Sequence, residues 1–366
     1  MTAADLNGLQ TENSPGVNRV DWVDYAKGIC IVLVVMMHST LGVEKAVGEP
    51  GMLNAFIEWA RPFRMPDFFL ISGLFLARRI NVPWRNYLDN KFLHFAYFYI
   101  LWMTIQFALK GYGIAKADGL PGLIASYSLG FVQPFGTLWF IYLLAIFFVV
   151  TKALVKVPPL LVFGVAALLQ IATIHTGWLV IDEFAERYVF FFSGYWLAAH
   201  VFAATTIMGK RNLFALMAML YIWATGHSLA MVTGFSEVPG MGLVLGFAGA
   251  GAVITTAIIL ARTEALSGLR YCGQNSIVIY LAFFLPMAAV RTLGLKFYPG
   301  INTDVLSVLT TAVAVVAALG LFWLVRKTPL SFLFKRPSWA KLNAVESRDK
   351  GWHSASHVKT LHPQIR

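Results

Sequence analysis

The chain is poor in charge and in cysteine. Charged residues make up 13% of its 366 positions, whereas 58% are hydrophobic and the mean hydropathy is +0.67. Soluble domains carry roughly 25% charged residues, so the composition excludes an ordinary soluble domain. The two cysteines, Cys30 and Cys272, are too few for a disulfide framework and match no spacing of metal ligands. The sequence therefore predicts a membrane protein without cysteine redox chemistry and without a metal site.

Long apolar segments define the expected fold. A bilayer core about 30 Å thick needs roughly 20 apolar residues of helix, and ten segments meet or approach that length. They lie near 25–43, 66–80, 92–109, 137–152, 158–175, 187–206, 213–232, 241–261, 274–294 and 305–325. We find no internal repeat, and the first 20 residues lack the pattern of a removable signal peptide. The expected fold is an all-α bundle of about ten transmembrane helices.

The membrane domain is expected to span 21–326, between a polar N-terminal segment at 1–20 and a basic tail at 327–366. An even number of spans places both termini on one side, and lysine and arginine concentrate in cytoplasmic loops. Here 20 of them fall in the terminal segments and every second loop, against 8 in the other loops. Both termini are therefore expected in the cytoplasm. The net charge of +11 then follows largely from topology, without a nucleic-acid partner, and the tail is expected to be loosely ordered near anionic lipid.

Two ionisable residues lie in the first span, where charge is costly and marks a candidate site. Lys27 and His38 begin and end the run "KGICIVLVVMMH". Eleven helical residues place them on nearly the same face, about 16 Å apart. Two simpler interpretations stay open, namely Lys27 as a snorkelling anchor and His38 as an interhelical hydrogen-bonding group. Asp24 is expected to pair with Lys27, and Asp21 with Asp24 to cap the helix.

The spacing suits a long substrate with an anionic head and a reactive far end. Acyl-coenzyme A carries phosphates at one end and a thioester at the other. Its phosphates would meet Lys27, the positive end of the first helix and the basic loop that holds Arg78, Arg79 and Lys91. His38 would then act as general base toward an incoming hydroxyl. Acyl-coenzyme A is thus expected as the donor substrate, with no bound cofactor.

Five segments resemble the acyltransferase-3 family of integral membrane acyltransferases, whose first span carries a basic residue and a histidine separated by ten positions. They are "DYAKGICIVLVVMMHS", "RMPDFFLISGLFLARR", "GTLWFIYLLAIF", "RYVFFFSGYWLA" and "YCGQNSIVIYLAFFLPM", in the family's order from about residue 18 to 330. Ser72 and Gly73 are the small pair of the second segment. Two positions depart from the pattern: an R-x-x-R pair becomes Lys91 and His94, and a histidine that often follows Tyr-Leu in the ninth span is absent.

The resemblance implies transfer of an acyl group, expected to be acetyl, from cytoplasmic acyl-coenzyme A to an extracytoplasmic glycan or glycolipid. Typical acceptors in that family include exopolysaccharide and lipopolysaccharide. The implied location is the bacterial cytoplasmic (inner) membrane, with membrane lipids and polysaccharide-synthesis machinery as further partners. A glycan or lipid transporter is the main alternative, and a structural partner of an export machine is another.

Further charged and polar residues are candidates for the site. Asp24 and Ser72 are expected to support it. Candidate acceptor contacts lie at the outer mouths of the second and sixth spans, where they could equally be solvated charges at loop ends. They are Arg64, Asp67, Glu186 and Arg187.

Reporter fusions test the orientation. A reporter after residue 330 is expected to be cytoplasmic and one near residue 115 extracytoplasmic, because the basic residues concentrate on the side of the termini. Alkaline phosphatase and fluorescent protein fusions measure this. Accessibility of residues 82–90 from outside the cell would contradict the assignment of the donor side.

Overall fold

The computed structural model describes residues 20–342, and helices are the only regular elements in this part of the chain. The predicted all-α class is confirmed. The predicted segment 1–20, apart from Val20, and the tail beyond residue 342 lie outside the described residues. The helices are α1 (Asp21–Val47), α2 (Leu53–Leu74), α3 (Trp84–Leu88), η2 (Asp89–Leu93), α4 (His94–Leu129), α5 (Trp139–Ala153), α6 (Pro159–Ile171), α7 (Leu179–Trp196), α8 (Ala198–Gly209), α9 (Leu213–Val232), η3 (Phe235–Glu237), α10 (Met241–Thr263), α11 (Ser267–Gln274), α12 (Ser276–Ala282), α13 (Phe284–Phe297), α14 (Thr303–Val325), η4 (Pro329–Leu333) and η5 (Ser338–Ala340).

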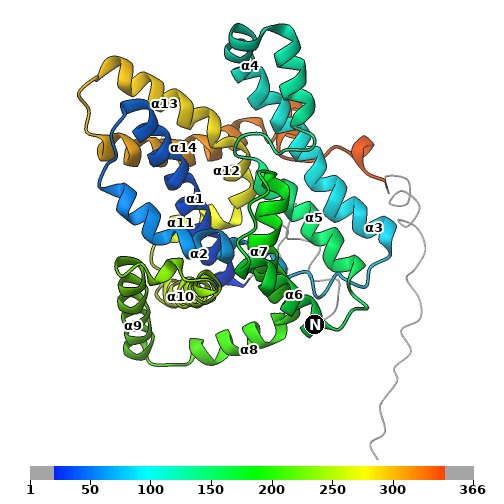
Figure 1. Cartoon of the computed structure of the whole chain (residues 1–366), viewed down its shortest axis with the longest axis vertical. Coiled ribbons are helices and arrows are strands. Elements are labelled where there is room, and N and C mark those ends of the chain that lie inside the picture. The colour runs from blue at the N-terminus through cyan, green and yellow to red at the C-terminus, as the bar shows by residue number, and fades with distance from the viewer. Residues whose placement is uncertain (1–19, 343–366) are drawn as a thin grey trace, which may run out of the picture.

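Helix α1 occupies the centre of the bundle. It contacts α2 and α10 on one side and α13 and α14 on the other, together with the short helices α11 and α12 (Figure 1). Most of its side chains are therefore held between protein neighbours. Its buried polar residues, such as Asp24 and Glu44, face other helices, which is the arrangement expected for ionisable residues in a membrane domain.

Glycines allow α2 and α7 to pack backbone against backbone. A Cβ atom at Gly73 of α2 would collide with the carbonyl oxygen of Phe191, and one at Gly194 of α7 would collide with that of Leu70. Small residues at helix contacts permit this close approach within membranes. The Ser-Gly and Gly-Tyr motifs of the sequence thus include the residues that join these two helices.

A second close contact joins α1 to α11. A Cβ atom at Gly28 would meet the carbonyl oxygen of Leu269, and one at Gly273 would meet that of Asp24. On α1 the contact involves Asp24 and Gly28, which lie on either side of Lys27. It therefore fixes the backbone that carries this lysine.

The ten expected spans are not confirmed within the described residues. Five helices are long and apolar enough to cross a membrane, and up to seven if the bent pairs α7–α8 and α12–α13 each count as one span. Those pairs bend by 72° and 50°, and α5 and α6 are shorter apolar helices. The expected second segment, 66–80, had the wrong limits because α2 begins at Leu53 and ends at Leu74. The internal prolines Pro62 and Pro66, together with several charges, hide its first half from a hydropathy reading.

The first part of the basic tail also differs from expectation. Instead of forming a loose segment, residues 328–341 make the turns η4 and η5 and return to α4. The indole of Trp102 donates to the carbonyl of Leu333 at 2.9 Å, and the Tyr97 hydroxyl donates to that of Phe332 at 3.1 Å. Apolar spacing gave no signal for this contact, because it depends on backbone carbonyls.

The α2–α7 contact is testable with one added methyl group. Gly194→Ala should lower the melting temperature of the purified protein in detergent by several degrees, since overpacking a tight contact costs about 1–3 kcal/mol. Gly226→Ala is the matched control, because a Cβ at this exposed glycine of α9 meets no atom within 4 Å. Equal melting temperatures for both variants would contradict the close packing.

Candidate active site

Lys27 and His38 both lie on α1, and no break separates them. The straight helix therefore sets their separation at about 16 Å, as the spacing predicts. Both are partly buried. The predicted capping of α1 by Asp21 and Asp24 is wrong, because Val20 is the N-cap and no side chain caps it. Asp21 instead pairs with Arg270 at 3.5 Å, and Asp24 is buried in α1.

A cavity of about 290 Å³ opens at the Lys27 end of the bundle. Its walls come from α1, α2 and the loop that follows it, α3, η2, α4, α5 and the tail, so they join segments that are far apart in sequence. Six basic side chains line it: Lys27, Arg79, Lys91, Lys335, Arg336 and Lys341. Within the described residues, no aspartate or glutamate lines it. We call this cavity the cationic pocket.

Aromatic rings form much of the remaining wall of the cationic pocket. The Lys27 ammonium lies 5.3 Å from the ring centre of Phe75, and the Lys91 ammonium lies 4.6 Å from that of Phe148. Such contacts hold a cation near an apolar surface without neutralising it. Ser72 also lines the pocket, but its hydroxyl donates to the carbonyl of Phe68 at 2.7 Å within the same helix. Ser72 therefore lies in the same cavity wall as Lys27, but its hydroxyl is engaged within α2.

The structure distinguishes between the predicted phosphate-binding residues. Lys27, Arg79 and Lys91 meet in the cationic pocket, but Arg78 is not among its lining residues. The Arg78 side chain is exposed and its guanidinium lies 6.0 Å from the ring centre of Phe202. Neighbouring residues on a turn point in different directions, so sequence position alone could not separate Arg78 from Arg79.

His38 lies away from the cationic pocket, in an aromatic and cationic setting. Its ring centre is 5.6 Å from that of Phe283, and the guanidinium of Arg64 lies within electrostatic range. Within residues 20–342 no group makes a hydrogen bond with the imidazole. The simpler interpretation of His38 as an interhelical hydrogen-bonding group therefore gains no support.

The departure noted in the ninth span lies beside this histidine. The resembling family often has a histidine after Tyr-Leu, whereas this chain has Ala282 followed by Phe283. Phe283 contacts the His38 ring, so this departure from the family pattern lies close to His38.

The candidate acceptor residues on α2 are not solvated charges at a loop end. Arg64 and Asp67 lie within α2 and are only 7% and 1% exposed. Arg64 donates to the carbonyl of Ile57 at 3.2 Å. Neither carboxylate oxygen of Asp67 has a hydrogen-bond partner in the part of the chain that the structure describes. Such burial is costly and is typical of functional positions.

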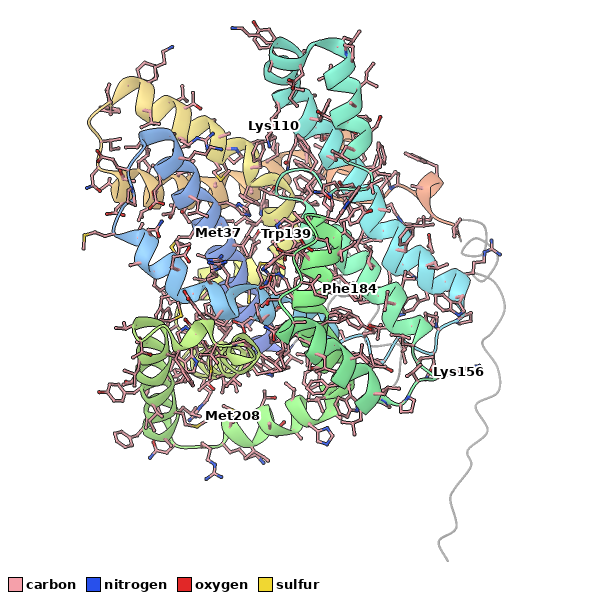
Figure 2. The ribbon with its side chains drawn as sticks, viewed as in Figure 1. Met37, Lys110, Trp139, Lys156, Phe184 and Met208 are labelled. Carbon is pink, nitrogen blue, oxygen red and sulfur yellow. The ribbon has the colours of Figure 1, made fainter. Side chains whose placement is uncertain are left out.

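The other two candidates lie on α7. Arg187 pairs with Glu183 and, at 3.4 Å, with Glu186, and its guanidinium lies 5.4 Å from the ring centre of Trp139. Arg187 is also within electrostatic range of Arg64. These residues therefore lie on the same side of the bundle as His38. Figure 2 labels Trp139 in the middle of the bundle, together with Met37, the neighbour of His38.

Sequence reasoning missed several residues. The tail residues of the cationic pocket went unnoticed because a basic tail normally indicates solvated charge. Two cations at the His38 end were also missed: Lys110, 4.6 Å from the ring centre of Phe284, and Arg291, which donates to the carbonyl of Gly42 at 3.3 Å. Their positions at the ends of apolar segments were the available signal. No cluster of metal-binding side chains occurs within 20–342.

Comparison with known proteins agrees with the resemblance. A family model described as "Acyltransferase domain", that of the acyltransferase-3 family, matches residues 20–327. The inner membrane protein YcfT of Escherichia coli (strain K12) is 26% identical over 239 residues, which cover 58% of this chain and 66% of that protein, just under two thirds of its length. No solved structure matches the chain. Because the family match includes both Lys27 and His38 and most of the helices, this multi-pass membrane protein belongs to the acyltransferase-3 family of membrane acyltransferases.

Proposed function

We propose that the protein is an O-acyltransferase of the bacterial inner membrane. It takes an acyl group, expected to be acetyl, from cytoplasmic acyl-coenzyme A and transfers it to a hydroxyl of an extracytoplasmic glycan or glycolipid. The cationic pocket carries this proposal, because basic side chains gather there without lining carboxylates at one end of the helix that bears His38. The family and the inner-membrane relative support the reaction class and the location.

The donor enters from the Lys27 end. Its phosphates bind Lys27, Arg79 and Lys91, as charge-assisted hydrogen bonds to phosphate favour basic side chains. The pantetheine arm then extends along α1 between α2 and its neighbours. This orientation brings the thioester toward His38, since the helix fixes the direction and the distance between the two ends.

At the far end, His38 acts as the general base. The acceptor oxygen attacks the thioester carbonyl while its proton passes to the imidazole. The tetrahedral intermediate then collapses, the carbon–sulfur bond breaks, and the proton moves from His38 to the departing thiolate. The products are the acyl ester and coenzyme A, and the histidine returns to its neutral form.

The acceptor side includes the residues near His38. Arg64 and Arg187 offer guanidinium groups, Glu186 and Asp67 offer carboxylates, and Trp139 offers a ring face on which a sugar can stack. We propose that these groups orient the acceptor hydroxyl. Membrane lipids and polysaccharide-synthesis machinery are the further partners of this proposal.

Purified protein tests the role of His38. With radiolabelled acetyl-coenzyme A and glycolipid from a strain lacking the protein, His38→Ala should lower kcat by roughly 10²–10⁴-fold with little change in the donor KM, because the base acts in the transition state. His200→Ala, at an exposed histidine of α8, is the control. Near-normal turnover of His38→Ala at saturating donor would refute the catalytic role. Absence of transfer by the wild type would favour the transporter alternative.

Two adjacent arginines test the donor site. Arg79→Gln should raise the donor KM by about 10-fold at nearly constant kcat, since a phosphate contact is present in both the ground and the transition state. Arg78→Gln should change the KM by less than about twofold, because Arg78 does not line the cationic pocket. Steady-state kinetics with varied donor concentration measure both values. Equal effects of the two variants would contradict this position for the phosphates.

A further inference from the structure

The segment after α14 is fixed to η2 by a buried ion pair. The Arg336 guanidinium donates to the side chain of Asp89 at 2.8 Å and to its backbone carbonyl at 2.6 Å. The same carboxylate accepts the backbone N–H of Leu342 at 3.0 Å. Arg336 and Asp89 are 6% and 4% exposed. Because removal of one partner from a buried pair is strongly unfavourable, this pair holds the tail in one position.

The partner of Arg336 belongs to the turn that also carries a pocket lysine. Asp89 begins η2 (Asp89–Leu93), and Lys91 lies two residues later. The ion pair therefore links the tail to the wall of the cationic pocket. Phe334 adds an apolar contact, with its ring centre 5.5 Å from that of Trp102. Arg336 is thus a positioning residue for the segment 334–341.

The tail contributes its two lysines to the exposed part of the pocket. Lys335 and Lys341 are both exposed and both line the cavity, whereas Lys27, Arg79 and Lys91 are only partly exposed. The pocket thus has an inner group of cations and an outer pair that comes from the tail.

We propose that Lys335 and Lys341 bind the 3′-phosphate of coenzyme A and make the enzyme selective for donors that carry it. This inference rests on the proposed function, which orients the donor. When the thioester points toward His38, the adenosine 3′-phosphate lies at the opposite end of the molecule, at the exposed rim. The inner cations are then placed for the diphosphate, and the tail lysines for the remaining phosphate.

Binding of coenzyme A and of 3′-dephospho-coenzyme A to purified protein tests the assignment. In detergent without phospholipid, the wild type should bind coenzyme A roughly 10-fold more tightly than 3′-dephospho-coenzyme A. The reason is that the 3′-phosphate adds contacts with two lysines, and such contacts account for a difference of this size. Lys335→Gln/Lys341→Gln should lose most of this preference while its affinity for the dephospho compound changes little. Isothermal titration calorimetry measures the four dissociation constants.

The control removes the same charge from the adjacent end of α14. Arg326→Gln/Lys327→Gln should keep the preference, because neither residue lines the cationic pocket. Arg336→Gln should reduce the preference, and Arg336→Lys should restore part of it, since a lysine can still pair with Asp89. A loss of stability alone would not change the ratio of the two affinities.

The outcomes separate this inference from the proposed function. A wild type that binds both compounds equally, or a lysine double variant that keeps the full preference, overturns the role of the tail lysines and leaves the donor site in place. Their charges would then serve another anion, such as a lipid headgroup. A wild type that binds neither compound overturns the proposed donor itself, and with it the tail assignment.

Discussion

The close approach of helix backbones at glycine is the constraint on which this structure depends. Gly73 and Gly194 join α2 to α7, and Gly28 with Gly273 joins α1 to α11. In a bilayer, helices gain little from burying apolar surface against one another, so shape and small residues decide which helices meet. Both contacts lie beside residues of the cationic pocket, because Gly28 follows Lys27 and Gly73 follows Ser72.

The bundle keeps its polar groups at two levels along α1. Near Lys27 basic side chains line a cavity without carboxylates in its described wall, as an anionic ligand requires. Near His38 they are mixed, with Arg64, Asp67 and the paired Arg187 held among aromatic rings. A buried and unpartnered carboxylate such as that of Asp67 is unfavourable for the fold. Its burial is therefore a cost to stability, as is typical of functional positions within a membrane domain.

The sequence predicted what depends on periodicity and failed where distant segments meet. Helical spacing was enough to place Lys27 and His38 on one face, and low charge was enough for the all-α membrane class. The sequence could not show which of Arg78 and Arg79 lines the cationic pocket, because that depends on the direction of one turn. The prolines of α2 concealed the helix that buries Arg64. Arg336 was assigned to a loose tail because its partner, Asp89, lies 247 positions earlier in the chain.

The position of the tail has a consequence for the order of assembly. The cationic pocket is lined by Lys27, from the first described helix, and by Lys341, from the last described segment. During synthesis, every helix between them must enter the membrane before these two walls can meet. Contacts between such distant segments form late, because a long loop must close first. A nascent chain therefore completes the cationic pocket only after its membrane domain has been inserted.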